Sequence, residues 1–239
     1  MQDLPEHGHS QAEIDDRLSR PPGRGDLRDV VYGAIDGAVT TFAIVAGVAG
    51  AGLSPFVIVA LGLANVLADG FSMAAGNYSA TKAELDDISR LRAVEERHIR
   101  LDPEGERREL RTILANKGLS GPTLEAAVDQ IAARRDSWIA EMMQGEYGLG
   151  PTDPHPLRAA LVTFAAFLVA GMIPLLPFVL GIGEAFFLSS ALTLAAFFAI
   201  GTLKSHWSLS PWWRSGAETL AIGGAAAGIA YGVGTLFTV

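Results

Sequence analysis

The sequence predicts an all-α, polytopic membrane protein with five transmembrane helices and a three-helix insert on the cytosolic side. Five apolar stretches of about 20 residues, the length that crosses a bilayer, are the first observation. A charged segment with a helical pattern, residues 82–156, separates the second stretch from the third. All 18 Lys and Arg residues fall on one side of the membrane if the five stretches alternate in direction.

The first two apolar stretches, residues 30–50 and 56–81, each contain one charged residue. Asp36 is the charge in the first stretch and Asp69 the charge in the second. Residues 51–55, with the sequence AGLSP, predict a tight turn between them.

The other three stretches follow the charged segment and cover residues 159–183, 185–203 and 219–239. Pro174 and Pro177 interrupt the first of these. Proline removes a backbone hydrogen bond from a helix, so we expect a kink there.

The distribution of basic residues predicts the orientation. With a cytosolic N-terminus the outer loops are residues 51–55 and 181–184, and neither contains Lys or Arg. Because cytosolic loops are enriched in these residues, we expect the N-terminus and the insert in the cytosol and the C-terminus outside. The inner loop before the fifth stretch has three tryptophans suited to the membrane interface: Trp207, Trp212 and Trp213.

The chain therefore divides into four predicted parts. They are a disordered cytosolic tail (residues 1–28), transmembrane helices 1–2 (29–81), a cytosolic helical metal-binding domain (82–156) and transmembrane helices 3–5 (157–239). In the third part, one helix continues the second span to about residue 100. A second begins at Asp102-Pro103 and ends at Gly118, and a third covers about residues 123–144.

Composition excludes several classes of function. The chain has no cysteine, which excludes disulfides, thiolate metal sites and cysteine nucleophiles. Its net charge of −8 argues against nucleic-acid binding. Residues 1–28 lack an apolar core, so we do not expect a cleavable signal peptide. The only His pair in this tail, His7 and His9, is interpreted as incidental.

Acids inside lipid-spanning helices mark functional sites, because burying a carboxylate there is costly. Asn65, Asp69 and Met73 are four residues apart and share one face of the second span. Asp36 and Thr40 share a face of the first. Opposed, the two faces would offer carboxylate, amide, hydroxyl and thioether groups. This set suits a borderline ion such as Fe²⁺ better than Mg²⁺ or Ca²⁺.

A structural role for Asp36 is the alternative. It lies near the inner end of its span, where it would cap the helix or pair with Arg28 or Lys204.

The insert contains a second set of ligand-type residues: Glu95, His98, Glu106, Glu109, Met142, Met143 and Glu146. Glu95 and His98 are three residues apart, as are Glu106 and Glu109, so each pair lies on one helical face. Three converging helices would bring oxygen, nitrogen and sulfur ligands around one metal ion. The alternative is that charges at this spacing form an ordinary solvated helix surface.

Small residues four apart predict close helix packing, because they let backbones approach within lipid. They are Gly33 and Gly37 in the first span, and Gly224, Gly228 and Gly232 in the fifth. The sequence does not distinguish whether these glycines pack helices within one chain or form the contact between two chains of a dimer.

The residues around the two intramembrane acids resemble a known family. The segments DGAVTTF from Asp36 and ADGFSMAAG from Ala68 are similar to the first two spans of the vacuolar iron transporter family. The similarity extends over the chain from about Asp29 and includes the five spans, the long second helix and the insert. It implies a homodimer with the metal path between subunits, and Fe²⁺ export from the cytosol driven by proton exchange.

The resemblance also assigns individual residues. Asp36 and Met73 match pathway residues of the family, and the insert residues other than His98 match its cytosolic metal ligands. His98 stands where the family usually has a glutamate, and Asn65 stands where some members have an acid.

The sequence thus predicts a transporter that moves divalent metal out of the cytosol by proton antiport, without a prosthetic group. Fe²⁺ is the first candidate and Mn²⁺ the second, while Co²⁺ and Zn²⁺ are not distinguished. The expected partners are membrane lipid, a second copy of the chain, metal ions and protons. The abundance of Ala, Gly and Arg is typical of a high-GC bacterium, where the membrane would be the plasma membrane; in a eukaryote it would be vacuolar.

Two other classes compete with this prediction. A membrane-bound metal sensor or scaffold would use the insert without transport. An intramembrane aspartyl protease also needs two buried acids, but Asp36 and Asp69 lack the Tyr-Asp and Gly-x-Gly-Asp signatures of such proteases. We therefore expect no enzymatic activity.

Overall fold

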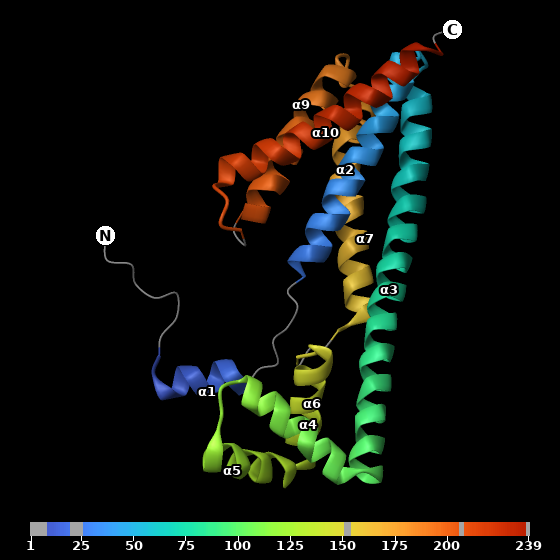
Figure 1. Cartoon of the computed structure of the whole chain (residues 1–239). Helices are drawn as coiled ribbons and strands as arrows, with labels where there is room; N and C mark the ends of the chain where they lie inside the picture. The colour runs from blue at the N-terminus through green and yellow to red at the C-terminus, as the bar shows by residue number, and fades with distance from the viewer. Residues whose placement is uncertain (1–8, 20–25, 151–153, 206–207, 238–239) are drawn as a thin grey trace, which may run out of the picture. The chain divides into compact units, whose positions relative to one another are not determined.

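The chain is helical throughout the part that the computed structural model describes, which is residues 9–19, 26–150, 154–205 and 208–237 (Figure 1). No strand occurs among these residues, which confirms the predicted all-α class. The chain forms two compact units. The membrane unit comprises Gly25–Thr81 and His155–Val239, and the insert unit comprises Met1–Arg24 and Lys82–Pro154.

Four helical segments of the described chain are long and apolar enough to cross a membrane. They are α2 (Leu27–Gly50), α3 (Pro55–Leu101), the segment Pro156–Val179 and α9 (Ala185–Ser205). The polytopic membrane character is therefore confirmed. The fifth predicted span coincides largely with α10 (Trp212–Thr235), which is less apolar and is not among the four. Five spans with an outer C-terminus remain a prediction.

Helix α2 occupies the middle of the membrane unit and contacts α7 (Pro156–Met172), α9 and α10 (Figure 1). Its glycines explain the close contact with α7. A Cβ added at Gly33 or Gly37 would lie 2.4 Å from a backbone carbonyl oxygen of α7. Packing within one chain is thus confirmed for this pair. A Cβ at Gly224, Gly228 or Gly232 would meet nothing within 4 Å in the described chain.

The predicted kink at the prolines is confirmed. Helix α7 ends at Met172, and a 3₁₀ turn, η1 (Ile173–Leu175), leads into the short helix α8 (Leu176–Val179). The Ser189 hydroxyl donates a hydrogen bond of 2.6 Å to the Pro174 carbonyl and supports the break.

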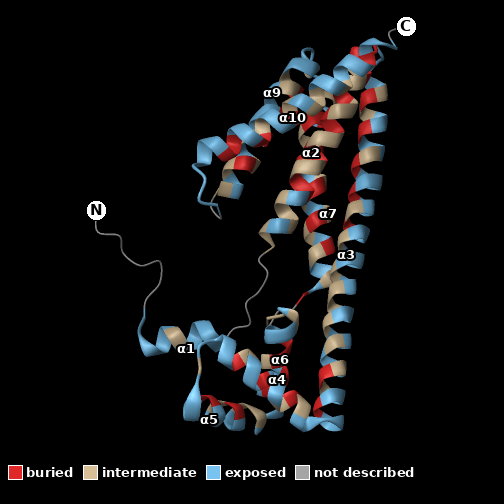
Figure 2. Ribbon diagram, in the orientation of Figure 1, coloured by how far each residue is buried: buried red, intermediate tan, exposed pale blue. Residues whose placement is uncertain are grey.

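The apolar part of α3 is mostly exposed (Figure 2). Phe56 and Phe71 are 78% and 70% exposed. Such a surface is suited to contact with lipid rather than water, since its own backbone hydrogen bonds are satisfied within the helix.

The insert unit has its own hydrophobic core. The distal part of α3 packs with α4 (Pro103–Asn116), α5 (Gly121–Ala132) and α6 (Arg135–Tyr147) around a shared apolar cluster. The cluster's buried residues are Ile99, Leu110, Leu114, Leu124, Val128, Trp138, Ile139, Met142 and Met143. The predicted start of α4 is confirmed, because the Asp102 side chain accepts a hydrogen bond from the Gly105 backbone N–H.

The prediction of one helix over residues 123–144 is wrong. Arg134 has an extended backbone that separates α5 from α6. The break lets Val128 and Trp138 both face the core. Tertiary packing therefore overrides the local preference for a continuous helix, although no Gly or Pro occurs at this point. The structure also differs from the predicted tail, because Gln11–Ser19 form helix α1, none of whose residues is buried.

Candidate metal sites

The first site lies between α2 and α3 within the membrane unit. Thr40 donates a 2.8 Å hydrogen bond to the Asp36 backbone carbonyl, as a threonine one turn later in a helix can. The Asn65 amide of α3 lies 3.5 Å from the Thr40 hydroxyl. Asp69 is close enough for its charge to act on Asp36. Met73, one turn beyond Asp69, is partly buried. The structure therefore brings the two predicted faces together.

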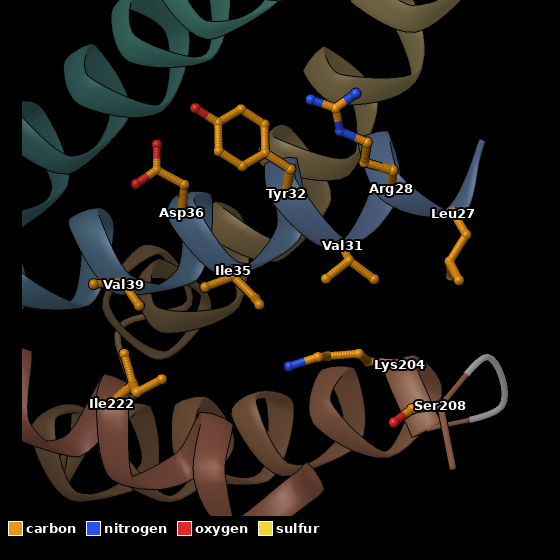
Figure 3. Close-up of a pocket in the computed structure, with 10 residues that line it drawn as sticks. All are labelled: Leu27, Arg28, Val31, Tyr32, Ile35, Asp36, Val39, Lys204, Ser208 and Ile222. Carbon is orange, nitrogen blue, oxygen red and sulfur yellow. The ribbon is translucent and has the colours of Figure 1, made fainter. Parts of the chain in front are cut away.

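Asp36 has no ion pair with Arg28 or Lys204 among the described residues, so the structural alternative gains no support. Lys204 instead lies 3.9 Å from Glu218. Figure 3 shows Asp36 and Lys204 lining one cavity, with the carboxylate directed away from the amine.

Sequence reasoning missed Asn77. Its amide donates to Asp29 on α2 at 3.0 Å and to the buried Thr163 hydroxyl on α7 at 2.7 Å. One side chain therefore connects three helices through hydrogen bonds. The signal was present in the sequence, because Asn77 follows Met73 by four residues and extends the same polar face of α3.

The second site lies in the insert unit and centres on two buried carboxyl groups. Glu95 is 0% exposed and Glu106 is 5% exposed, and their side chains share a hydrogen bond. The Tyr147 hydroxyl donates to Glu95 Oε1 at 2.8 Å. The other oxygens, Oε2 of Glu95 and Oε2 of Glu106, are buried without a hydrogen-bond partner. Orphaned buried carboxylate oxygens are costly unless a proton or a cation satisfies them.

Further titratable groups surround this pair. His98 Nδ1 lies 3.5 Å from Glu106 Oε1. Glu109 and Glu146 are exposed, but their charges reach Glu106. Burial, and then the negative charges of Glu95, Glu109 and Glu146, raise the pKa of Glu106 to about 7.

The two methionines have a different environment. Met142 is fully buried and Met143 nearly so, and both belong to the apolar cluster of the insert. Met143 also lines a separate cavity of about 500 Å³ with Ile88 and Leu149. Methionine commonly fills gaps in such cores. The structure thus gathers the carboxylates and His98 and places both methionines in the apolar core, while their predicted role as metal ligands stays a prediction.

The described residues form no preassembled cage of three or more His, Asp or Glu side chains. The donor set around Glu95 and Glu106 nevertheless fits a divalent cargo ion. It offers two unsatisfied buried oxygens, an adjacent imidazole and two further carboxylates at the rim.

Apolar membrane-spanning helices with internal carboxylates are typical of membrane proteins that bind or move ions. Comparison with known proteins is more specific. The VIT family model matches residues 27–235, and the chain belongs to this family. The resemblance found in the sequence is thereby confirmed.

Named relatives agree with this assignment. Vacuolar iron transporter 1 of Arabidopsis thaliana is 35% identical over 208 residues, which cover 86% of this chain and 83% of the relative. The vacuolar iron transporter of Toxoplasma gondii is 35% identical over 222 residues, or 88% and 74% of the two chains. Vacuolar iron transporter 1 of Oryza sativa is 32% identical over 210 residues, or 87% and 83%. The family consists of transporters rather than enzymes.

Proposed function

We propose that this protein transports a divalent metal, with Fe²⁺ as the cargo, out of the cytosol in exchange for protons. The names of its relatives support iron as the cargo. Mn²⁺ is the next candidate, because the same oxygen-rich donors accept it.

The observation that supports transport most strongly is the polar face between α2 and α3. The Asn65 amide of α3 lies next to the Thr40 hydroxyl of α2, and the charge of Asp69 acts on the half-buried Asp36 within these apolar spans. Placing these carboxylates inside the membrane costs free energy, and no ion pair in the described chain offsets that cost. A passing dication would offset it.

In this mechanism the insert captures the ion from the cytosol. Glu95 and Glu106 release their shared proton and bind the metal, with His98, Glu109 and Glu146 completing the electrostatic attraction. The ion then passes to Asp36, Asp69 and Met73 in the membrane unit. Protons returning from the other side compete for the same carboxylates, because metal ligands bind in their deprotonated form. Two chains form the transport unit and place these residues on both sides of a shared path.

Metal flux into sealed proteoliposomes tests the proposal. We expect Fe²⁺ uptake by the wild-type protein, faster with an acidic interior and abolished in Asp36→Asn. The exposed Asp87→Asn, which removes a carboxylate from the insert surface, should transport normally. Metal binding without flux would favour the sensor alternative, and normal flux by Asp36→Asn would exclude Asp36 from the path.

A further inference from the structure

A cavity of about 650 Å³ in the membrane unit borders the proposed metal path, because Asp36 is among the residues that line it. It is formed by the beginning of α2, the end of α9 and part of α10. Its α2 wall includes the aliphatic residues Leu27, Val31, Ile35 and Val39, and Ile222 faces them from α10 (Figure 3). Arg28, Tyr32 and Asp36 of α2 also border the cavity, with their polar groups directed away from Lys204.

The α2 wall has the form of an acyl-chain groove. Val31, Ile35 and Val39 are four residues apart, so they form one continuous apolar stripe about 12 Å long along the helix. Branched aliphatic side chains give no polar group to a soluble ligand or an ion along this length. An extended hydrocarbon chain is the ligand that such a stripe accommodates.

Two polar side chains line the cavity opposite the aliphatic wall of α2. The Lys204 side chain, from the last turn of α9, extends along the gap between α9 and α2, and Ser208 lies near the base of this side chain (Figure 3). The nearest carboxylate to Lys204 is Glu218 at 3.9 Å, and both side chains are about half exposed, so this pair is weak. The Lys204 amine in this largely aliphatic cavity therefore remains available to an anionic group.

We propose that this cavity binds a phospholipid with an anionic headgroup. Lys204 and Ser208 hold the phosphate, and one acyl chain lies along Val31, Ile35 and Val39. Basic pockets between transmembrane helices bind anionic headgroups in this way. The assignment concerns a regulatory or stabilising lipid and is independent of the metal that the protein carries.

Native mass spectrometry of the purified full-length protein in detergent tests the proposal. Phosphatidylglycerol and phosphatidylcholine are added separately at equal concentrations. We expect about fivefold tighter retention of phosphatidylglycerol, as one lysine contributes near a membrane surface. Lys204→Gln should remove the preference and Lys204→Arg should retain it. Arg214→Gln, at an exposed cation that does not line the cavity, should leave it unchanged.

Ile222→Trp supplies a second test, because its bulk fills the cavity without altering the charge. We expect weaker retention of phosphatidylglycerol at an unchanged oligomeric state. Equal retention of the two lipids, an unchanged preference in Lys204→Gln, or an equal loss in Arg214→Gln would each overturn the proposal. So would displacement by inorganic phosphate, which would indicate a soluble anion, or a change of oligomeric state in Ile222→Trp, which would indicate that a second copy covers the cavity.

Discussion

The raised pKa of Glu106 predicts that protons compete with metal at the insert. With a pKa of about 7, the carboxyl is about one-tenth protonated at pH 8 and about nine-tenths protonated at pH 6. Because metal binds the deprotonated form, the apparent affinity should fall about tenfold between these values. The sign follows from burial and the neighbouring carboxylates, which both disfavour the charged form.

Calorimetric titration of the purified protein with Co²⁺, an air-stable substitute for Fe²⁺, measures this effect at pH 6, 7 and 8. Glu106→Gln should bind weakly at all three values and lose most of the pH dependence. Glu104→Gln, which removes an exposed carboxylate from the same helix, should behave as the wild type. Affinity that is constant from pH 6 to 8 in the wild type would refute the reasoning.

The same pKa shift affects stability in the absence of metal. A carboxyl whose folded pKa lies above its ordinary value of 4.5 stabilises the fold fully below pH 4.5, and this contribution is lost as the pH rises through 7. The loss has an upper limit of about 3 kcal/mol. The melting temperature of the metal-free protein should therefore fall between pH 5 and 8, and less so in Glu106→Gln. A melting temperature that rises over this range in the wild type and not in the variant would contradict the sign.

Three further substitutions have defined outcomes. Asn77→Ala should lower the free energy of unfolding by about 1–3 kcal/mol and slow metal flux, because the buried Thr163 hydroxyl and the partly buried Asp29 carboxylate both lose its hydrogen bonds; thermal melts and liposome uptake measure both. Gly37→Ala should destabilise by about 1–3 kcal/mol through a clash with α7, whereas Gly224→Ala, where nothing lies within 4 Å, should be nearly neutral in the same melts. Tyr147→Phe should weaken Co²⁺ binding without unfolding the insert, because it frees Glu95 to move from its bonded position; an unchanged affinity would remove Tyr147 from the site.

Local signals made several elements predictable from the sequence. Helix α3 continues from the membrane unit into the insert unit as one element, because no Gly or Pro interrupts residues 77–101. The start of α4 was also predictable from the sequence, since Asp102 and Pro103 are typical of a helix N-terminus. The polar faces of α2 and α3 followed from the four-residue spacing of their side chains.

Tertiary packing determined what the sequence left open. The break at Arg134 has no local signal, and it places Val128 of α5 and Trp138 of α6 in the same buried cluster. The ligand role of Met142 stays a prediction, and the sequence spacing did not reveal that Met142 and Met143 are both buried in the apolar cluster of the insert. Asn77 was missed because a single amide in the middle of a long helix cannot be distinguished from an exposed polar residue until its partners on α2 and α7 are known.

Coupled ion movement across a sealed membrane tests the central claim most directly. Proteoliposomes with an internal pH indicator receive external Fe²⁺ under anaerobic conditions. The account predicts that metal entry makes the interior more alkaline in the wild type and that neither change occurs in Asp36→Asn. Metal entry without any internal pH change, or an equal response in Asp36→Asn, would contradict it.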